Sequence, residues 1–292
     1  MDILILAQDR MKANAVAAEL RRPGWQISAA PDPSEGVAAA RRHRPSVILL
    51  DDLLTGGGAS GVCEQLRALP QTVDIPIVIL GSGACVASAC LGFRVLGNAT
   101  LRHGFAKTDM FAAIQEAQAW RARLLEQQIQ AEVVMELASD HHHLMDAGTY
   151  LETLCAATHL CHQQAKRLCH AFLEVGQNAI EWGHARFPEK TVRVEFRVHE
   201  DRVELIVQDQ GPGYDPRNLP HAACIEDPLR HLAVRERLGL RDGGFGLLIA
   251  RGLVDRLKIG GRGNKVTLLM RVSREGTGLV SSPSPSVRLA SP

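Results

Sequence analysis

Along residues 1–106, short apolar runs alternate with segments in which apolar residues recur at helical spacing. The apolar runs predict five strands, at residues 3–6, 25–29, 46–50, 75–80 and 99–102. The intervening segments predict helices at residues 11–21, 33–42, 61–69 and 84–93. Apolar strands that alternate with helices are typical of a parallel sheet covered on both faces. We therefore predict an α/β domain with five parallel strands over residues 1–106.

The pattern over residues 107–138 predicts one long helix, because this segment is rich in Ala, Gln, Glu and Leu and contains no Pro or Gly. At about 1.5 Å per residue, about 30 residues extend about 45 Å, which is enough to hold two domains apart. Its apolar residues follow an imperfect heptad, so two interpretations stay open. The segment is either a coiled-coil dimer element or the extended last helix of the first domain. In both cases residues 107–140 form a helical linker.

After residue 141 the pattern predicts a second domain. Residues 163–185 have helical spacing, and alternating runs at 191–198 and 202–207 predict two neighbouring strands. A glycine turn enters an apolar helix at residues 243–250, and residues 263–270 form a last strand. We place this domain at residues 141–274. Residues 275–292 are rich in Gly, Ser and Pro, a composition that predicts a disordered tail.

Charge and cysteine usage narrow the class of protein. Lys and Arg total 33 and Asp and Glu total 32, so the overall charge gives no reason to expect nucleic acid or a membrane surface as a partner. No apolar run approaches the roughly 20 residues of a membrane span, and the N-terminal residues are unlike a secretory signal. Seven cysteines without a Cys-x-x-Cys pair are typical of reduced thiols. We therefore expect a cytoplasmic protein.

An acidic residue ends the third predicted strand, in the sequence Leu49-Leu50-Asp51. With its length and five-fold strand and helix order, the first domain resembles the receiver domain of bacterial response regulators, which has the flavodoxin-like fold. The resemblance implies that Asp51 is the phosphoacceptor. The family's acidic pair after the first strand is replaced by Ala7-Gln8, which leaves only Asp9. Loss of paired carboxylates weakens Mg²⁺ binding.

Two further family positions in this domain also differ. The usual Thr or Ser falls on Gly81, and the usual Lys falls near Arg102. We therefore expect a degenerate receiver that serves as a docking or dimer surface.

Glu174 and Asn178 are four residues apart on a predicted helix, hence on one face and about 6 Å from each other. A carboxylate can accept a proton from a hydroxyl, and an Asn carbonyl can give Mg²⁺ a neutral oxygen ligand. The alternative is a solvated polar face of an amphipathic helix.

An alternating run leads into Asp209, and the chain then turns through Gly211 and Gly213. This pattern suits either a plain hairpin or a site that grips a ligand through a carboxylate and main chain. Downstream, Gly244 and Gly246 lead into an apolar helix whose first backbone amides can hold phosphate.

Taken in order, four elements resemble the GHKL (histidine kinase-like) ATP-binding superfamily, which folds as an α/β sandwich with a mixed sheet. These are the Glu-x-x-x-Asn helix, Asp-x-Gly-x-Gly, Gly-x-Gly-Leu and the closing strand. The segments Asn-Ala-Ile-Glu-Trp-Gly and Asp-Gln-Gly-Pro-Gly-Tyr-Asp-Pro look most like the anti-sigma-factor serine kinases. That subfamily typically has His where this chain has Trp182.

The resemblance implies roles for individual residues. Glu174 would be the general base, Asn178 the Mg²⁺ ligand and Asp209 the acceptor for the adenine amino group. Gly211 and Gly213 would let the base approach, and the phosphates would lie at Gly244, Gly246 and Leu247. The family's usual Thr falls on Asn264, with Thr267 nearby. Residues 215–242 would form an ATP lid, with candidate γ-phosphate contacts at Arg217, Arg230, Arg235, Arg237 and Arg241; the alternative for these arginines is solvation.

These features predict a signalling protein that binds ATP and Mg²⁺. The leading hypothesis is a serine/threonine kinase acting on an anti-sigma-factor antagonist, with a homodimer through the receiver or the linker helix. The alternative is a switch that grips a sigma factor or antagonist without phosphotransfer. A histidine kinase-like activity is a third hypothesis, although too few residues separate His143 from Asn178 for its dimerisation hairpin. Residues 141–143, three consecutive histidines, point in different directions and predict an exposed joint.

Overall fold

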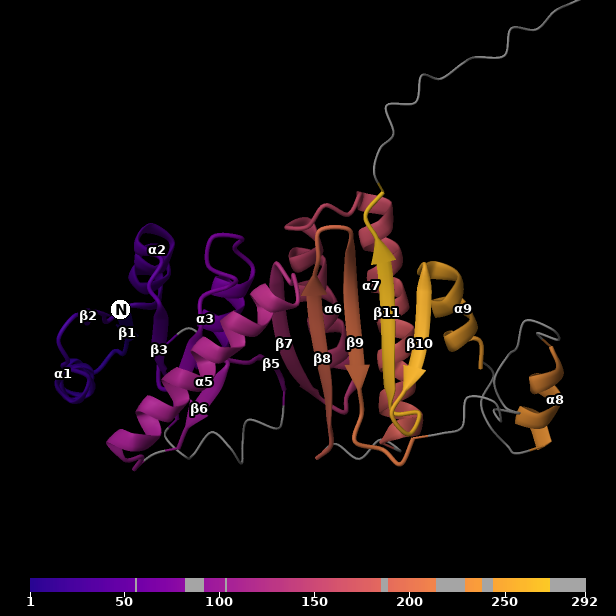
Figure 1. Cartoon of the computed structure of the whole chain (residues 1–292). Helices are drawn as coiled ribbons and strands as arrows, with labels where there is room; N and C mark the ends of the chain where they lie inside the picture. The colour runs from indigo at the N-terminus through magenta and orange to yellow at the C-terminus, as the bar shows by residue number, and fades with distance from the viewer. Residues whose placement is uncertain are drawn as a thin grey trace, which may run out of the picture.

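A five-stranded parallel sheet, sheet A, forms the first part of the molecule (Figure 1). The computed structural model describes residues 1–55, 57–81, 92–102, 104–184, 189–213, 229–237 and 244–273. The strands of sheet A, in spatial order, are β2 (Gln26–Ala30), β1 (Asp2–Leu6), β3 (Val47–Asp51), β4 (Ile77–Leu80) and β6 (Ala99–Leu101). This order is that of flavodoxin-like folds, as predicted.

Apolar strands and acidic helix caps explain this part of the fold. All five residues of β3 are buried, which requires helices on both faces of the sheet. The helices are α1 (Arg10–Glu19), α2 (Pro33–His43), α3 (Gly58–Arg67) and α5 (Lys107–Glu126). Asp9 and Asp32 begin α1 and α2, since each carboxylate accepts hydrogen bonds from backbone amides of the first turn.

A six-stranded sheet, sheet B, forms the second part. Its strands, in spatial order, are β10 (Arg256–Gly260), β11 (Lys265–Arg271), β9 (Arg202–Gln208), β8 (Thr191–Val198), β7 (Ala131–Ala138) and β5 (Phe93–Val95). We expected a mixed sheet, whereas all its pairings among the described residues are antiparallel. Its helices are α6 (His141–Ala156), α7 (His162–Asn178), α8 (Arg230–Arg237) and α9 (Gly246–Leu253). Figure 1 shows α6 and α7 behind the sheet, which confirms the predicted α/β sandwich.

The predicted helix over residues 107–138 is wrong in its last third. Helix α5 ends at Glu126, Gln128 adopts a positive φ of 55°, and the chain then forms β7. Eight residues of β7 pair with β8. The side chains of Val133, Met135 and Leu137 are buried, and this period of two is the strand signal that the Ala and Glu content obscured. Helix α5 also packs on sheet A through Met110, so residues 107–140 are not a free linker.

Strand β5 lies between β4 and β6 in sequence but belongs to sheet B, where it pairs with β7. We predicted a helix over residues 84–93. Residues 82–91 lie outside the described residues, and Phe93 begins β5 instead. The backbone amide of Val95 donates to Ser60 Oγ of α3 at 2.9 Å, so β5 also joins a helix of sheet A. Strand β5 thereby links sheet B to a helix that covers sheet A.

Buried polar contacts join the two parts across this junction. The indole N–H of Trp120, on α5, donates to Glu132 Oε2 of β7 at 2.6 Å. The other oxygen of Glu132 accepts from Arg197 Nε at 2.8 Å. Tyr150 of α6 donates through its hydroxyl to the carbonyl of Glu64 in α3 at 2.9 Å. One continuous apolar core includes buried residues of both sheets, so the two parts share an interior.

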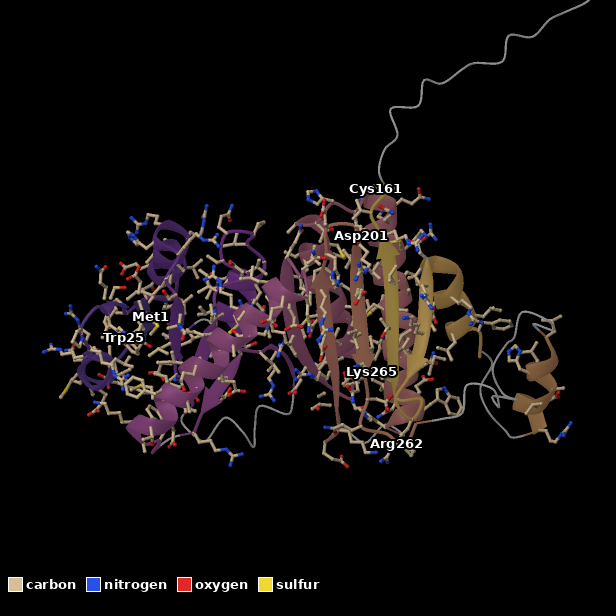
Figure 2. The ribbon with its side chains drawn as sticks, in the orientation of Figure 1. Met1, Trp25, Cys161, Asp201, Arg262 and Lys265 are labelled. Carbon is tan, nitrogen blue, oxygen red and sulfur yellow. The ribbon has the colours of Figure 1, made fainter. Side chains whose placement is uncertain are left out.

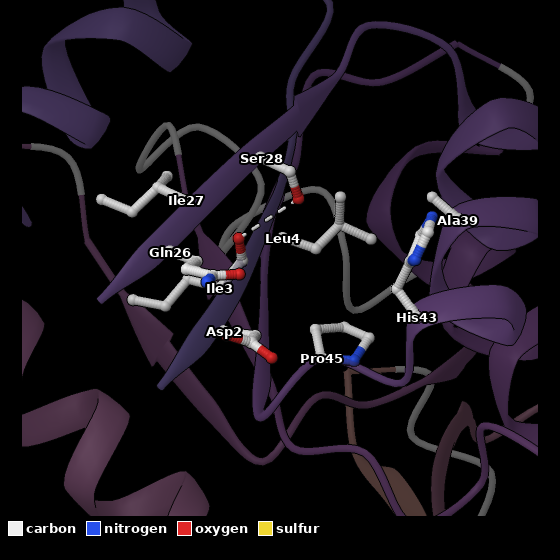
Figure 3. Close-up of a pocket in the computed structure, with 9 residues that line it drawn as sticks. All are labelled: Asp2, Ile3, Leu4, Gln26, Ile27, Ser28, Ala39, His43 and Pro45. Carbon is white, nitrogen blue, oxygen red and sulfur yellow. Dashed lines mark hydrogen bonds between the residues drawn. The ribbon is translucent and has the colours of Figure 1, made fainter. Parts of the chain in front are cut away.

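A cavity of about 370 Å³ lies at the edge of sheet A (Figure 3). Asp2 and Gln26 line it at the amino ends of β1 and β2, and Ser28 Oγ donates to the carbonyl of Ile3 at 3.4 Å. Ligands of such sheets bind at the carboxyl ends of the strands, so this cavity is not at the expected position. Within the described ranges, no helix is long and apolar enough to cross a membrane. The predicted tail, residues 275–292, lies outside those ranges.

Candidate functional site

Helix α7 carries Glu174 and Asn178 toward one end of sheet B. Phe172 and Val175 pack into the core and orient the helix, which leaves Glu174 and Asn178 partly exposed. Glu174 Oε1 lies 3.6 Å from Nε2 of His170, one turn earlier. The amide nitrogen Nδ2 of Asn178 is buried and has no hydrogen-bond partner among the residues that the structure describes. A buried, unpaired amide is costly unless a ligand uses it.

After Asn178 the helix widens into one π-helical turn, η2 (Ala179–Gly183). The backbone amide of His184 donates to the carbonyl of Ala179 at 3.0 Å and closes this turn. Single π turns inside α-helices occur frequently at functional sites. Here the widened turn brings Gly183 against Asp209: a Cβ at Gly183 would lie 2.5 Å from Asp209 Oδ1.

Helix α9 begins against the side chains of Glu174 and Asn178. A Cβ on Gly246, its first residue, would lie 2.8 Å from Glu174 Oε2 and 3.2 Å from Asn178 Nδ2. Arg167 of α7 donates to the carbonyl of Leu253 at 2.8 Å, which fixes the other end of α9. Gly244 and Leu247 flank Gly246 at the start of the helix. The amino end of α9, where backbone amides favour anions, therefore faces Glu174 and Asn178.

The Asp209 turn is held by the strands beside it. The backbone amide of Asp209 donates to the carbonyl of Asn264 at 3.0 Å, and Asn264 Nδ2 donates to the carbonyl of Asp209 at 3.1 Å. The amide of Gly211 donates to Asp209 Oδ1 at 2.7 Å. Burial raises the pKa of the Asp209 carboxyl above its ordinary value, although the Gly211 amide opposes this. Gly213 has a φ of +78°, and a Cβ there would meet the carbonyl of Arg262.

Thr267 does not join this group. Val266 and Leu268, its neighbours on β11, point into the core, so Thr267 points to the other face of the sheet. It lines a hollow there with Glu204 and Ile206. The structure therefore does not bring Thr267, predicted as a cofactor-binding residue, together with Glu174 and Asp209, and Asn264 lies next to Asp209 instead. In Figure 2, Arg262 and Lys265 mark the end of sheet B where this group lies, and Cys161 and Asp201 mark the opposite end.

In sheet A, Asp51 is buried at the end of β3 and pairs with Lys12. Lys12 Nζ lies 2.6 Å from Asp51 Oδ1, and the Asp51 side chain is only 3% exposed. Asp9, the remaining acid near the first strand, accepts from the amide of Met11 as the cap of α1. The cation beside Asp51 is thus a lysine of the chain, which the sequence pattern did not reveal. Phosphorylation of Asp51 stays a prediction.

Residues 137–270 match the family model of the Histidine kinase-like ATPase domain. The first part of the chain is similar to curated regulators. It is 31% identical over 96 residues to Probable transcriptional regulatory protein TcrX of Mycobacterium tuberculosis, covering 33% of this chain and 40% of TcrX. It is 34% identical over 82 residues to Response regulator PleD of Caulobacter vibrioides, covering 27% of this chain and 18% of PleD. This chain therefore spans less than half the length of either relative.

A solved response regulator receiver domain protein from Clostridium thermocellum aligns with 42% of this chain and 98% of its own, at 18% identity and a TM-score of 0.37. Residues 137–270 thus match a histidine kinase-like ATPase domain, and the first part of the chain is similar to response regulators. Such an ATPase domain implies ATP binding.

The ATPase domain thus gathers most of the predicted site residues at one end. Glu174, Asn178 and Gly246 meet there, and Asp209 with Gly211 adjoins the end of the same helix. Sequence reasoning missed His184, which contacts the Asp209 turn, because a lone histidine after a helix carries no motif. Most of the predicted lid, residues 215–242, lies outside the described residues. Of its arginines, Arg237 is exposed on α8, and Arg230 and Arg235 belong to the same helix.

Proposed function

We propose that the ATPase domain is a serine/threonine protein kinase that transfers the γ-phosphoryl group of ATP to a small regulatory protein of the anti-sigma-factor-antagonist type. The observation that carries this proposal is the meeting of Glu174, Asn178 and the amino end of α9, with a Cβ position on Gly246 2.8 Å from Glu174 Oε2. A base, an amide ligand and a phosphate-binding helix end are the groups that phosphoryl transfer requires.

The residues of this site fit ATP with Mg²⁺. The Asn178 amide nitrogen is buried without a partner in the described part of the chain, and Gly246 keeps the space between Asn178 and α9 free of a side chain. Asn178 would hold Mg²⁺ through its amide oxygen, and the metal would neutralise phosphate charge. Asp209 would accept a hydrogen bond from the adenine amino group, while Gly211 leaves room for the base.

Glu174 would then act on the protein substrate. Its carboxylate accepts the proton of the Ser or Thr hydroxyl, whose oxygen forms the new bond to phosphorus as the bond to the departing ADP breaks. His170, 3.6 Å from Glu174 Oε1, can orient the carboxylate. His170 and Glu174 lie on the same helix, so they need not move far relative to each other.

A specific observation favours a second function, an ATP-gated switch that holds a sigma factor or antagonist without phosphotransfer. The receiver and ATPase domains share one apolar core and the strand β5, so a change of shape in one is carried to the other. Such a protein would need Asp209 and Asn178 for ATP but would not need a base at Glu174.

Transfer of label from γ-labelled ATP separates these functions. The full chain is incubated with Mg²⁺, labelled ATP and a candidate antagonist protein encoded beside it. A kinase gives an acid-stable label on the antagonist, and Glu174→Gln lowers transfer by about 10²-fold or more while ATP affinity is kept. Asp201→Asn, at the far end of the domain, is the matched control (Figure 2).

Other results point elsewhere. ATP binding with antagonist binding but without label on it supports the switch and overturns the kinase. An acid-labile label on a histidine supports the third hypothesis, a histidine kinase-like activity. Failure to bind ATP overturns all three.

A further inference from the structure

His184 lies directly behind the Asp209 turn and is fully buried. Its Nδ1 lies 2.8 Å from Ser139 Oγ, at the end of β7. Its Nε2 accepts a hydrogen bond from the backbone amide of Gln210 at 2.8 Å. One ring therefore connects three segments that are far apart in sequence: the end of β7, the end of the α7–η2 helix and the turn that carries Asp209.

The partners of the ring fix its tautomer. A backbone amide can only donate, so Nε2 of His184 must accept with its lone pair. The neutral ring then carries its proton on Nδ1 and donates it to Ser139 Oγ. Protonation of Nε2 would place a second N–H against the Gln210 amide and break the contact. The arrangement uses the neutral form of the ring.

The contact to Gln210 completes the support of Asp209 from both sides. Asn264 holds the backbone of Asp209 on the β11 side through two hydrogen bonds. On the other side, Gly183 lets the helix end approach Asp209, and His184 bonds the next residue, Gln210. Asn178 lies six residues before His184 on the same helical segment. The His184 side chain thus sets the position of the Asp209 carboxylate relative to Asn178.

We propose that His184 is a positioning residue for base recognition: it holds the Asp209 turn against the helix that carries Glu174 and Asn178. This inference rests on the proposed function, because it takes Asp209 as the acceptor for adenine. A purine with an oxygen in place of the 6-amino group has no donor at that position, so the preference for adenine depends on where the Asp209 carboxylate is held.

The charged groups around the ring agree with this role. Burial, together with the positive charge of Lys190, lowers the pKa of His184 to about 4, so the ring is neutral near pH 7. Asp209, which also faces this region, has its carboxyl pKa raised by burial. Each contact described for His184 is made by a neutral partner.

Base preference is the readout that separates positioning from a merely structural role. ATP and ITP are titrated into the full chain with Mg²⁺ by calorimetry, because ITP lacks the 6-amino group. His184→Phe keeps the ring volume but removes the acceptor for the Gln210 amide. We expect it to lower ATP affinity about ten- to hundredfold while ITP affinity changes little, so the ATP preference collapses.

Two other variants and a control complete the experiment. His184→Gln can offer an amide oxygen near the Nε2 position and should restore most of the ATP preference. Ser139→Ala removes the partner of Nδ1 and should lower the preference less, which tests the proposal even when His184→Phe does not fold. His159→Gln, an exposed histidine on the loop after α6, is the matched control and should match the unsubstituted chain.

The outcomes are distinguishable. Equal losses for ATP and ITP in His184→Phe, or an unchanged ATP preference in a folded His184→Phe and in Ser139→Ala, overturn the positioning role. An unsubstituted chain that binds ATP and ITP equally overturns the adenine role of Asp209 and so the proposed use of this site. A chain with ATP preference that His184→Phe removes and His184→Gln restores supports both.

Discussion

At the scale of single residues, burial has changed the chemistry of the groups that surround the Asp209 turn. The pKa of the Asp209 carboxyl is raised and the pKa of His184 is lowered to about 4, in both cases chiefly by burial. Both shifts favour the uncharged form of the group. For His184 this is the form that its hydrogen bonds require.

The lowered pKa of His184 predicts how stability depends on pH. A histidine whose pKa falls from 6.5 to about 4 on folding stabilises the protein fully above pH 6.5, and this contribution is lost as pH falls toward 4. The free energy of unfolding of the unsubstituted chain and of His184→Gln is measured by urea titration at pH 7, 5.5 and 4.5. Their difference should shrink as pH falls. A constant difference contradicts the prediction. The titration of Asp209 cancels from the difference, because both chains contain this residue.

Single residues also show which parts of the candidate site can be predicted from the sequence. Glu174, Asn178 and Asp209 could be predicted, because helical spacing and a strand end determine which side chains share a face. His184 and Asn264 contact the Asp209 turn only once β7, β11 and the helix end are assembled, and no local spacing encodes that. Thr267 was assigned to the site because it is near Asn264 in sequence, although strand alternation places it on the opposite face.

At the scale of elements, the start of α9 depends on the absence of a side chain at Gly246. Gly246→Ala places a Cβ 2.8 Å from Glu174 Oε2 and 3.2 Å from Asn178 Nδ2, so one of these must move. A shift of about 1 Å in a catalytic group can cost about 10²-fold in rate, and we expect a loss of that order in ATP-dependent transfer. The free energy of unfolding of Gly246→Ala should not fall, because Ala favours a helix over Gly by up to about 1 kcal/mol.

Gly252 supplies the control on the same helix. A Cβ there meets no atom of the described residues within 4 Å, so Gly252→Ala should keep both stability and transfer. Equal activity of Gly246→Ala and Gly252→Ala would show that the start of α9 is not part of the site.

Elements also mark the limit of sequence reasoning in this chain. Strands β1, β3 and β4 of sheet A were predictable, because they are runs of apolar residues. Strand β7 was not, because Ala131–Ala138 contains Glu and Ala that favour a helix, and only pairing with β8 stabilises it as a strand. The nonlocal partner decided the structure of this segment.

At the scale of the whole molecule, the shared core predicts that the receiver and ATPase domains unfold together. Trp120→Phe removes the indole donor from Glu132 Oε2, a buried partner 2.6 Å away. Loss of this hydrogen bond leaves Oε2, among the described residues, with only the 3.5 Å contact from Arg123 and should lower the free energy of unfolding by about 1–3 kcal/mol. Urea unfolding followed by circular dichroism should show one transition in both chains, at lower urea for Trp120→Phe.

Trp25→Phe is the matched control, since Trp25 lies near Met1 at the far end of sheet A (Figure 2) and packs against Phe111 rather than across the junction. Its transition should shift less than that of Trp120→Phe. Two separate transitions in the unsubstituted chain would show that the domains are independent despite the shared core.

The position of β5 means that no single cut of the polypeptide can separate the two sheets. A fragment that stops before residue 93 lacks β6 and α5, and a fragment that begins at residue 131 leaves the outer edge of β7 without its neighbour. An uncovered edge strand invites association with other chains. Isolated halves of this protein should therefore tend to associate with other chains. Any exchange of one half for a homologous module must include β5.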